Sequence, residues 1–245
     1  MSNNPIFDSV SAAWSSEEAR GKKILDLSCG AGDLAAMLAK LGYHVVATNY
    51  GAAPALAGDR RVGGVDLNAC LPFRSASFDG VDLVEVIEHI ENHPQRIREI
   101  ARVLKPNGVV LISTPNILNM MSRARFLFTG FLRGRVRPAH YTNKPGRAPN
   151  IYLLHFYELY YLLFHYGFEV VELRRTRVKF ATWCFMILLW PFMWPLSLVA
   201  VIHAEKDPVQ RRYNWQILSY LFDPALLLSD NIVIKARRCE NRTGA

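Results

Sequence analysis

The sequence has few of the features that mark several protein classes. Its four cysteines form neither a Cys-x-x-Cys pair nor a metal-ligand spacing; they are Cys29, Cys70, Cys184 and Cys239. They predict reduced thiols in a cytoplasmic protein and no metal site. The stretch that begins at Met1 lacks the basic and apolar regions of a secretory signal. No RNA-binding signature or aromatic stacking motif is present, so we expect no nucleic-acid partner.

Acidic residues are missing from a long central stretch. Between Ile100 and Tyr157 the sequence has no Asp or Glu. The net charge of the whole chain is +8, and the basic residues of this stretch account for that excess of positive charge. Its basic residues are Arg102, Lys105, Arg123, Arg125, Arg133, Arg135, Arg137, Lys144 and Arg147. This basic block predicts attraction to phosphate groups on an acceptor or on an anionic membrane, and a solvated basic face is the alternative.

The chain is organised around an apolar run, Lys23 to Leu27, that leads into a glycine turn. Gly30 and Gly32 permit positive φ angles and a close approach of a ligand, and a helical pattern follows. The spacing also fits the dinucleotide fingerprint. Asp26 separates the two interpretations, because its carboxylate would repel a pyrophosphate and attract an ammonium or a sulfonium. The turn therefore favours S-adenosylmethionine over NAD.

Several further motifs follow this turn in order. They are Asp66-Leu67-Asn68, Leu71-Pro72-Phe73, Phe78-Asp79, Glu85-Val86-Ile87-Glu88-His89-Ile90, Arg102 to Gly108 and Ser113-Thr114-Pro115-Asn116. Together they resemble the class I S-adenosylmethionine-dependent methyltransferases, in the branch with quinone, small-molecule and surface-glycan enzymes. The resemblance covers roughly Gly21 to Asn116. It implies an α/β, Rossmann-like sheet of seven strands in the order 3-2-1-4-5-7-6 with a helical cap.

The resemblance also implies where the cofactor binds. The expected cofactor residues are Asp26, Ser28, Cys29, Gly30, Gly32, Asn49, Asp66, Leu67 and Glu85. Asn49 follows a predicted second strand, His44 to Thr48, at a position where this fold usually has an acid; Tyr50 is an alternative partner for the ribose. Asp66 is expected at the end of a third strand, Val62 to Leu67. Asp82 is unusual, because it falls inside a fourth strand expected to be buried in a parallel sheet.

Candidate catalytic residues follow that fourth strand, since ligands of open α/β sheets bind outside the carboxyl ends of strands. His89 is a candidate general base, with Glu88 beside it. The alternative is that both brace the floor of the site. Asn116 is a candidate acceptor contact after the fifth strand, Val109 to Ser113. His155 is a further acceptor-site candidate, although a packed histidine is the simpler interpretation.

Two segments beyond Asn116 differ from the regular core. Ile117 to Leu132 mixes aromatic residues with Arg123 and Arg125, which favours a lid or membrane-surface helix that contacts the substrate. Phe180 to Ile202 is uncharged and long enough to span a membrane. A single crossing would separate the last strand from its sheet, and Pro191 and Pro195 are expected to break the helix.

We therefore expect a bent, re-entrant or in-plane helical pair, with a buried helix or an oligomer interface as alternatives. The predicted organisation is a cofactor-binding core (1–116), a basic lid (117–166), two last strands (167–175 and 230–238) and a hydrophobic insertion (176–229). The predicted function is O-methylation of a lipid-linked acceptor such as a glycan, on the inner face of an anionic membrane. The alternatives are methylation of a quinone or other apolar molecule, and a non-catalytic scaffold.

Overall fold

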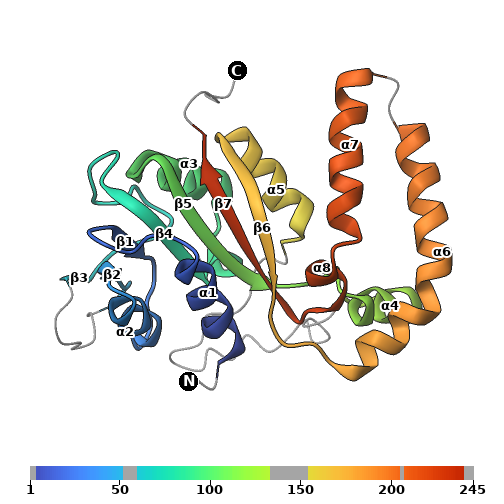
Figure 1. Ribbon diagram of the computed structural model, residues 1–245, viewed down its shortest axis with the longest axis horizontal. Helices are drawn as coiled ribbons and strands as arrows, with labels where there is room; N and C mark the ends of the chain where they lie inside the picture. Colours follow the sequence, from blue (N-terminus) through green and yellow to red (C-terminus); the bar gives the residue numbers. More distant parts are fainter. Residues whose placement is uncertain (1–3, 52–59, 133–153, 205–206, 240–245) are drawn as a thin grey trace.

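The computed structural model describes residues 4–51, 60–132, 154–204 and 207–239. One mixed sheet of seven strands has the order β3-β2-β1-β4-β5-β7-β6, which confirms the predicted order (Figure 1). The strands are β1 (Lys23–Asp26), β2 (His44–Thr48), β3 (Arg60–Val62), β4 (Phe78–Val84), β5 (Leu104–Pro115), β6 (Phe168–Arg175) and β7 (Asn231–Arg238). Strand β7 runs antiparallel to both of its neighbours, β5 and β6.

Helices cover both faces of the sheet because its strands alternate their apolar side chains. Ile24 belongs to a core under α1 (Pro5–Ser15) and α2 (Asp33–Lys40). Leu25, one residue later, belongs to the opposite core under α3 (His93–Val103) and α5 (Phe156–His165). A strand with both faces buried must be apolar almost throughout, which explains the continuous apolar runs of β1 and β5.

Two strands differ from their predicted bounds. Strand β3 ends at Val62, whereas the sequence pattern predicted a strand from Val62 to Leu67. Gly63 and Gly64 follow directly, and Gly64 has a φ angle of 70°, which is incompatible with extended backbone. Strand β5 begins at Leu104, earlier than predicted, and its pairing with β4 shifts register between Phe78 and Gly80.

The insertion after β6 folds into three helices, α6 (Phe180–Ala204), α7 (Pro208–Leu221) and α8 (Pro224–Leu228). Helices α6 and α7 stand beside one another at the edge of the molecule (Figure 1). The predicted break at Pro191 and Pro195 is wrong, because α6 is helical through both prolines. Figure 1 shows α6 bending along its length instead. A proline removes one backbone donor, and a long helix can absorb that loss as a bend.

Helix α1 is fastened across the sheet by Trp14. Its indole Nε1 donates to Asp82 Oδ1 at 2.7 Å, and its ring packs edge-on against Tyr43. The ring also covers Gly80, where an added Cβ would lie 2.2 Å from Trp14 Cη2. Gly80 is therefore the residue that lets α1 lie this close to β4.

Gly80→Ala is expected to lower the free energy of unfolding by about 1–3 kcal/mol, because the new methyl group overlaps the Trp14 ring. Chemical denaturation of the variant and the parent measures this change. Gly51→Ala is the control, since a Cβ at Gly51 meets no atom of the described part of the chain within 4 Å. Equal unfolding midpoints for Gly80→Ala and Gly51→Ala would contradict the packing argument.

Candidate active site

The glycine turn joins β1 to α2 at the carboxyl edge of the sheet. Gly30 and Gly32 have φ angles of 56° and 88°, a region that glycine enters without steric cost. Among the described residues, no heavy atom would lie within 4 Å of a Cβ atom at Gly30, which leaves room over this backbone. Helix α2 follows, and no described side chain caps the backbone N–H groups of its first turn. The predicted strand, turn and helix are confirmed.

Ser28 and Cys29 are held by the neighbouring strand β2. Ser28 has a φ angle of 65°, which is strained for a residue with a side chain. Its N–H donates to Thr48 Oγ1 at 3.1 Å, and the Cys29 N–H donates to the Thr48 carbonyl oxygen at 2.9 Å. Burial raises the pKa of the Cys29 thiol. Thr48 thus fixes the start of the turn, a role that its place in an apolar strand did not indicate.

Two buried carboxyl groups belong to neighbouring strands, β1 and β4, one of which leads into the turn. Asp26 ends β1 and pairs in register with Asp82 of β4. Both are buried, and burial raises the pKa of Asp26 to about 7 and that of Asp82 well above its usual range. The Oδ2 atom of each has no hydrogen-bond partner among the described residues. A carboxyl group in this state attracts a cation, because a positive charge would offset its desolvation.

Asp82 is the residue whose place in a buried strand had no explanation from the sequence. Its Oδ1 accepts the Trp14 indole hydrogen bond, and the charge of Asp26 adds to burial in keeping Asp82 protonated. The sequence did indicate that Asp82 needs a partner, because a carboxyl group in a strand covered on both faces requires a hydrogen-bond donor. Sequence reasoning did not identify Trp14 as that donor.

The loops after β2 and β3 carry Asn49, Asp66 and Leu67, at the same carboxyl edge of the sheet as the turn. Asn49 follows β2 as predicted, and its Oδ1 accepts from the N–H of Tyr50 at 3.1 Å. Asp66 is exposed in a loop beyond the shortened β3, where its Oδ1 accepts from the Asn68 N–H. Arg96 of α3 holds this loop, because its guanidinium donates to the carbonyl oxygen of Leu67.

Glu85 stands at the junction of three strands. It follows β4 with a φ angle of 56°, unusual for a residue with a side chain. Its Oε1 accepts from Ser113 Oγ at 2.9 Å, and its Oε2 accepts from Asn231 Nδ2 at 2.8 Å. Burial raises its pKa, although these two bonds and the nearby His89 act in the opposite direction. Ser113 of β5 and Asn231 of β7 therefore position Glu85, which the sequence alone did not reveal.

Glu88 and His89 lie in a short 3-10 helix, η1 (Ile87–His89), just after Glu85. Glu88 is 2% exposed and accepts from Thr114 Oγ1 at 3.5 Å. Burial and the charge of Glu85 raise the pKa of Glu88 to about 8. Glu88 thus retains a proton at neutral pH, which favours the interpretation that Glu88 braces the floor of the site and does not act as a base. His89 is half-buried, so this arrangement leaves His89 as the better candidate base.

The other predicted site residues lie further along the chain. Asn116 is buried, and its Nδ2 donates to the carbonyl oxygens of Leu226 and Ser229. This ties the end of β5 to α8, and its contact with an acceptor stays a prediction. His155 is exposed and caps α5, with its Nδ1 accepting from the Glu158 N–H at 3.2 Å. The cap gives His155 a structural role, although the side chain is exposed and not packed as the simpler interpretation expected.

Arg123 and Arg125 lie on α4 (Met120–Thr129), which follows β5. Arg123 donates through Nε to the Leu118 carbonyl oxygen at 2.6 Å, while its Nη2 is buried without a partner among the described residues. Burial lowers its pKa, and the facing Tyr157 acts in the opposite direction. The basic residues from Arg133 to Arg147 lie outside the described residues.

Residues 4–173 match the family described as a methyltransferase domain. The chain belongs to the class I S-adenosylmethionine-dependent methyltransferases. Ubiquinone biosynthesis O-methyltransferase of Xanthomonas oryzae pv. oryzae is 34% identical over 125 residues, 46% of this chain and 50% of that protein. Demethylmenaquinone methyltransferase of Clavibacter sepedonicus is 38% identical over 107 residues, 40% of this chain and 44% of that protein. The chain thus spans about half the length of the curated relatives it matches.

A solved structure extends the likeness of this methyltransferase-family chain over almost its whole length. It is the Burkholderia thailandensis 1,6-didemethyltoxoflavin-N1-methyltransferase, with 1,6-didemethyltoxoflavin and S-adenosylhomocysteine bound. The TM-score is 0.56 at 18% identity, and the match covers 97% of this chain and 80% of that one. At this identity the likeness shows the fold alone.

S-adenosylmethionine is the cofactor of the family, and the residues around the glycine turn fit it. The backbone at Gly30 leaves room for a ligand, and Asp26, with its unpartnered Oδ2, ends β1 four residues before this glycine. A sulfonium and an ammonium are the charges that a buried carboxyl group attracts. Asn49 lies at the end of the next strand, where its amide can bond a ribose hydroxyl.

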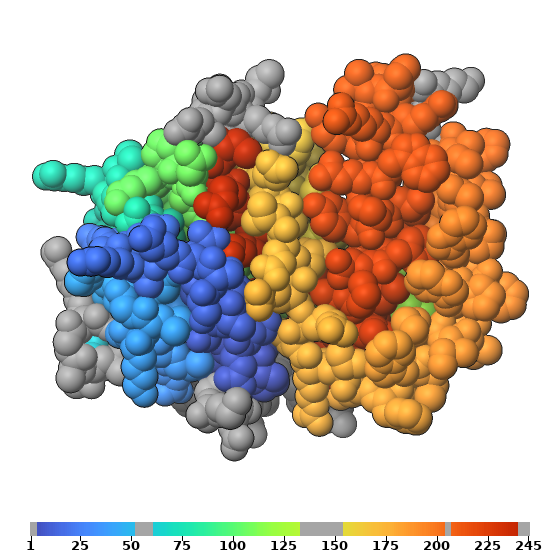
Figure 2. All heavy atoms as spheres, viewed as in Figure 1, coloured from blue at the N-terminus to red at the C-terminus, as the bar shows by residue number. Residues whose placement is uncertain are grey.

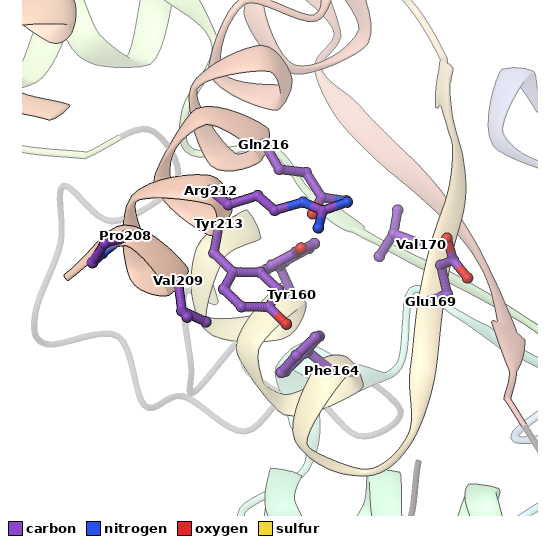
Figure 3. A pocket seen from close by; sticks show the side chains of 9 residues that line it. All are labelled: Tyr160, Phe164, Glu169, Val170, Pro208, Val209, Arg212, Tyr213 and Gln216. Atoms are coloured by element: carbon purple, nitrogen blue, oxygen red, sulfur yellow. The ribbon is translucent and has the colours of Figure 1, made fainter. Parts of the chain in front are cut away.

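A cavity of about 720 Å³ lies elsewhere, between α5, β6 and α7. Figure 3 shows Arg212 of α7 reaching toward β6, above the aromatic side chains of α5. Strands β4, β5 and β7 separate β6 from β1, so this cavity is remote from the glycine turn. We assign the active site to the turn because the titratable residues gather there.

Cofactor affinity is expected to fall below neutral pH. Asp26 has a pKa of about 7, so at pH 6 it must lose a proton before it can pair with a cation. Calorimetry should find S-adenosylmethionine bound roughly tenfold more weakly at pH 6 than at pH 8. Asp26→Asn is expected to bind weakly with little dependence on pH. The same pH dependence in Asp26→Asn would assign it to another group, such as Glu85 or Glu88.

Proposed function

We propose that this protein transfers a methyl group from S-adenosylmethionine to an oxygen atom of an apolar acceptor of the quinone type. The observation that carries the proposal is the placing of the cation-attracting Asp26 on β1 next to Glu85, Glu88 and His89, which follow the adjacent strand β4. Relatives named ubiquinone and demethylmenaquinone methyltransferases support this acceptor class. The activity and acceptor are proposals for this chain, since it spans half of those relatives.

The chemistry requires little from the protein beyond position and one proton transfer. The cofactor supplies a methyl group bound to a positively charged sulfur atom. As the carbon–sulfur bond breaks and a carbon–oxygen bond forms, the acceptor hydroxyl must lose its proton. His89 would take that proton, because it is half-buried in η1, which follows β4 at the carboxyl edge of the sheet. Ser113 and Asn231 would hold Glu85, and Thr114 would hold Glu88, so the floor of the site stays fixed.

His89→Asn is expected to lower kcat about 100-fold or more, which is typical of a lost general base. The affinity for S-adenosylmethionine should stay close to that of the parent, because His89 acts on the acceptor. Initial rates, with calorimetry for the cofactor, measure both effects. A kcat close to that of the parent would contradict the assignment of His89 as the base.

The acceptor class is tested by methyl transfer from tritiated S-adenosylmethionine. Purified protein is incubated with a hydroxylated quinone precursor or with membranes of the source cell, and the products are partitioned between organic solvent and water. Label on the quinone precursor in the organic phase is the expected result. Label that stays in water would contradict an apolar acceptor. Cofactor binding with no transfer to either acceptor would favour a non-catalytic scaffold.

A lipid-linked glycan that carries phosphate is the second candidate, favoured by the basic block between Ile100 and Tyr157. Such an acceptor would need the positive charges, whereas a quinone would not. Replacing Arg133, Arg135 and Arg137 by Gln should leave turnover of the quinone precursor within about twofold, because an acceptor without phosphate gives these positive charges no anionic group to attract. A large loss with membrane-derived acceptor alone would favour the phosphorylated glycan.

A further inference from the structure

Helix α6 is apolar on every side, yet the protein covers only one stripe of it. Among the described residues it is the one helix long and apolar enough to cross a membrane, and none of its most apolar part is buried. Phe185, Met186, Leu189 and Met193 pack against a small core with α4 and α8. Their spacing marks a single helix face. A surface helix of a globular protein would carry polar residues on its remaining sides.

The uncovered sides of α6 carry large apolar side chains instead. Figure 2 shows α6 along one edge of the molecule with its outer side uncovered in this view. The exposed residues include Phe180 (83%), Ile187 (71%), Leu188 (59%), Phe192 (65%), Trp194 (49%) and Leu196 (68%). An exposed apolar surface of this extent marks an interaction site. The insertion also lies beyond residue 173, where the match to the methyltransferase domain ends.

The apolar surface continues onto α4, which packs against α6. Phe126, Leu127 and Phe128 of α4 are each more than half exposed. Helix α4 follows β5 at the carboxyl edge of the sheet, the edge at which Glu85 and His89 lie. A surface that covers α4 and α6 together would therefore lie close to the entrance of the candidate active site.

The sheet excludes a transmembrane arrangement of α6. Strands β6 and β7 pair with one another on either side of the insertion, so the chain must leave and return on one side of any membrane. Helix α7 has 14 residues, including Arg211 and Arg212. About 20 apolar residues are needed to cross a bilayer, so α7 is too short and too polar to cross back. Helix α6 can meet a bilayer only from one side.

The charges around α6 suit the headgroups of anionic lipids. Arg175 and Arg177 are exposed just before α6, and Arg211 is exposed on α7 after it, whereas Arg212 lines the cavity between α5, β6 and α7. Lys179 instead forms an ion pair with Asp230 at 3.0 Å. Helix α6 itself contains no Asp, Glu, Lys or Arg. Exposed tryptophans such as Trp183 and Trp194 favour the boundary between headgroups and acyl chains.

We propose that the joined surface of α6 and α4 docks in the plane of an anionic membrane, with α6 immersed at the headgroup boundary. The apolar surface supplies insertion, and the flanking arginines supply attraction to anionic headgroups. Docking would place the entrance of the site at the membrane surface, where an apolar acceptor resides. The docking does not depend on catalysis, so it goes beyond the proposed function and is tested apart from it.

Flotation of the purified full chain with vesicles tests the proposal. The vesicles are phosphatidylcholine alone, or phosphatidylcholine mixed with phosphatidylglycerol. The chain should float with the mixed vesicles, float less with phosphatidylcholine alone, and detach in part at high salt, because screening weakens charge attraction. Its tryptophan fluorescence should shift to shorter wavelength on binding. Failure to float with either vesicle would overturn the proposal.

A variant with Ile187→Ser, Leu188→Ser, Trp194→Ser and Leu196→Ser tests which surface binds. Its partition to mixed vesicles should fall roughly tenfold or more, because apolar area drives insertion. The control is Tyr161→Ser with Val171→Ser, which removes side chains that are 65% and 50% exposed on α5 and β6. S-adenosylmethionine affinity, measured on each protein, shows that the fold is retained.

Two outcomes would identify a different occupant or surface. If the α6 variant floats as well as the parent does, α6 is not the docking surface. If the parent is a dimer that ignores vesicles and the variant is a monomer, the surface is an interface between two copies of this chain. Both results would overturn membrane docking through α6 and leave the proposed methyl transfer untouched.

Discussion

The pairing of β7 between its antiparallel neighbours, β5 and β6, is the constraint on which the rest of the structure depends. At one end of β7, Asn231 bonds Glu85 and so completes the floor of the candidate site. Further along, Lys235 is buried, pairs with Glu17 at 2.8 Å and donates to the carbonyl oxygen of Ala13, which fixes the end of α1. Because β7 must rejoin the sheet, the hydrophobic insertion before it must stay on the same side of any membrane as the candidate site.

The candidate site shows how burial converts ordinary carboxyl groups into groups with separate roles. Asp26, Asp82 and Glu88 all have raised pKa values because burial disfavours their charged forms. The Oδ2 atoms of Asp26 and Asp82 both lack a partner among the described residues, but Asp82 Oδ1 accepts the Trp14 indole bond, whereas Asp26 ends its strand just before the glycine turn. Two acids of one type on adjacent strands therefore differ: Asp82 holds α1 through Trp14, and Asp26 is the candidate for a cationic ligand.

Much of the fold could be predicted from local pattern. The turn at Gly30 and Gly32, the strand Phe78–Val84 and the sheet order follow from apolar runs, glycines and family motifs. The errors arose where local rules met a wider context. Gly63 and Gly64 ended β3 early, and the prolines of α6 bent a helix that they were expected to break. In the candidate site, the sequence motifs pointed to Glu85, Glu88 and His89. They did not reveal that Ser113, Thr114 and Asn231 form hydrogen bonds with the two glutamates, because these partners are distant in sequence.

The sequence by itself determined the family, the cofactor and the presence of a long apolar segment, because each is encoded in residues that are close along the chain. The tertiary structure decided which of those residues have partners. Only the packed strands show that Asp26 faces Asp82, and only the packed helices show that α6 keeps most of its apolar surface uncovered. Burial and partner choice depend on contacts between distant segments, and a pattern read along one segment does not contain them.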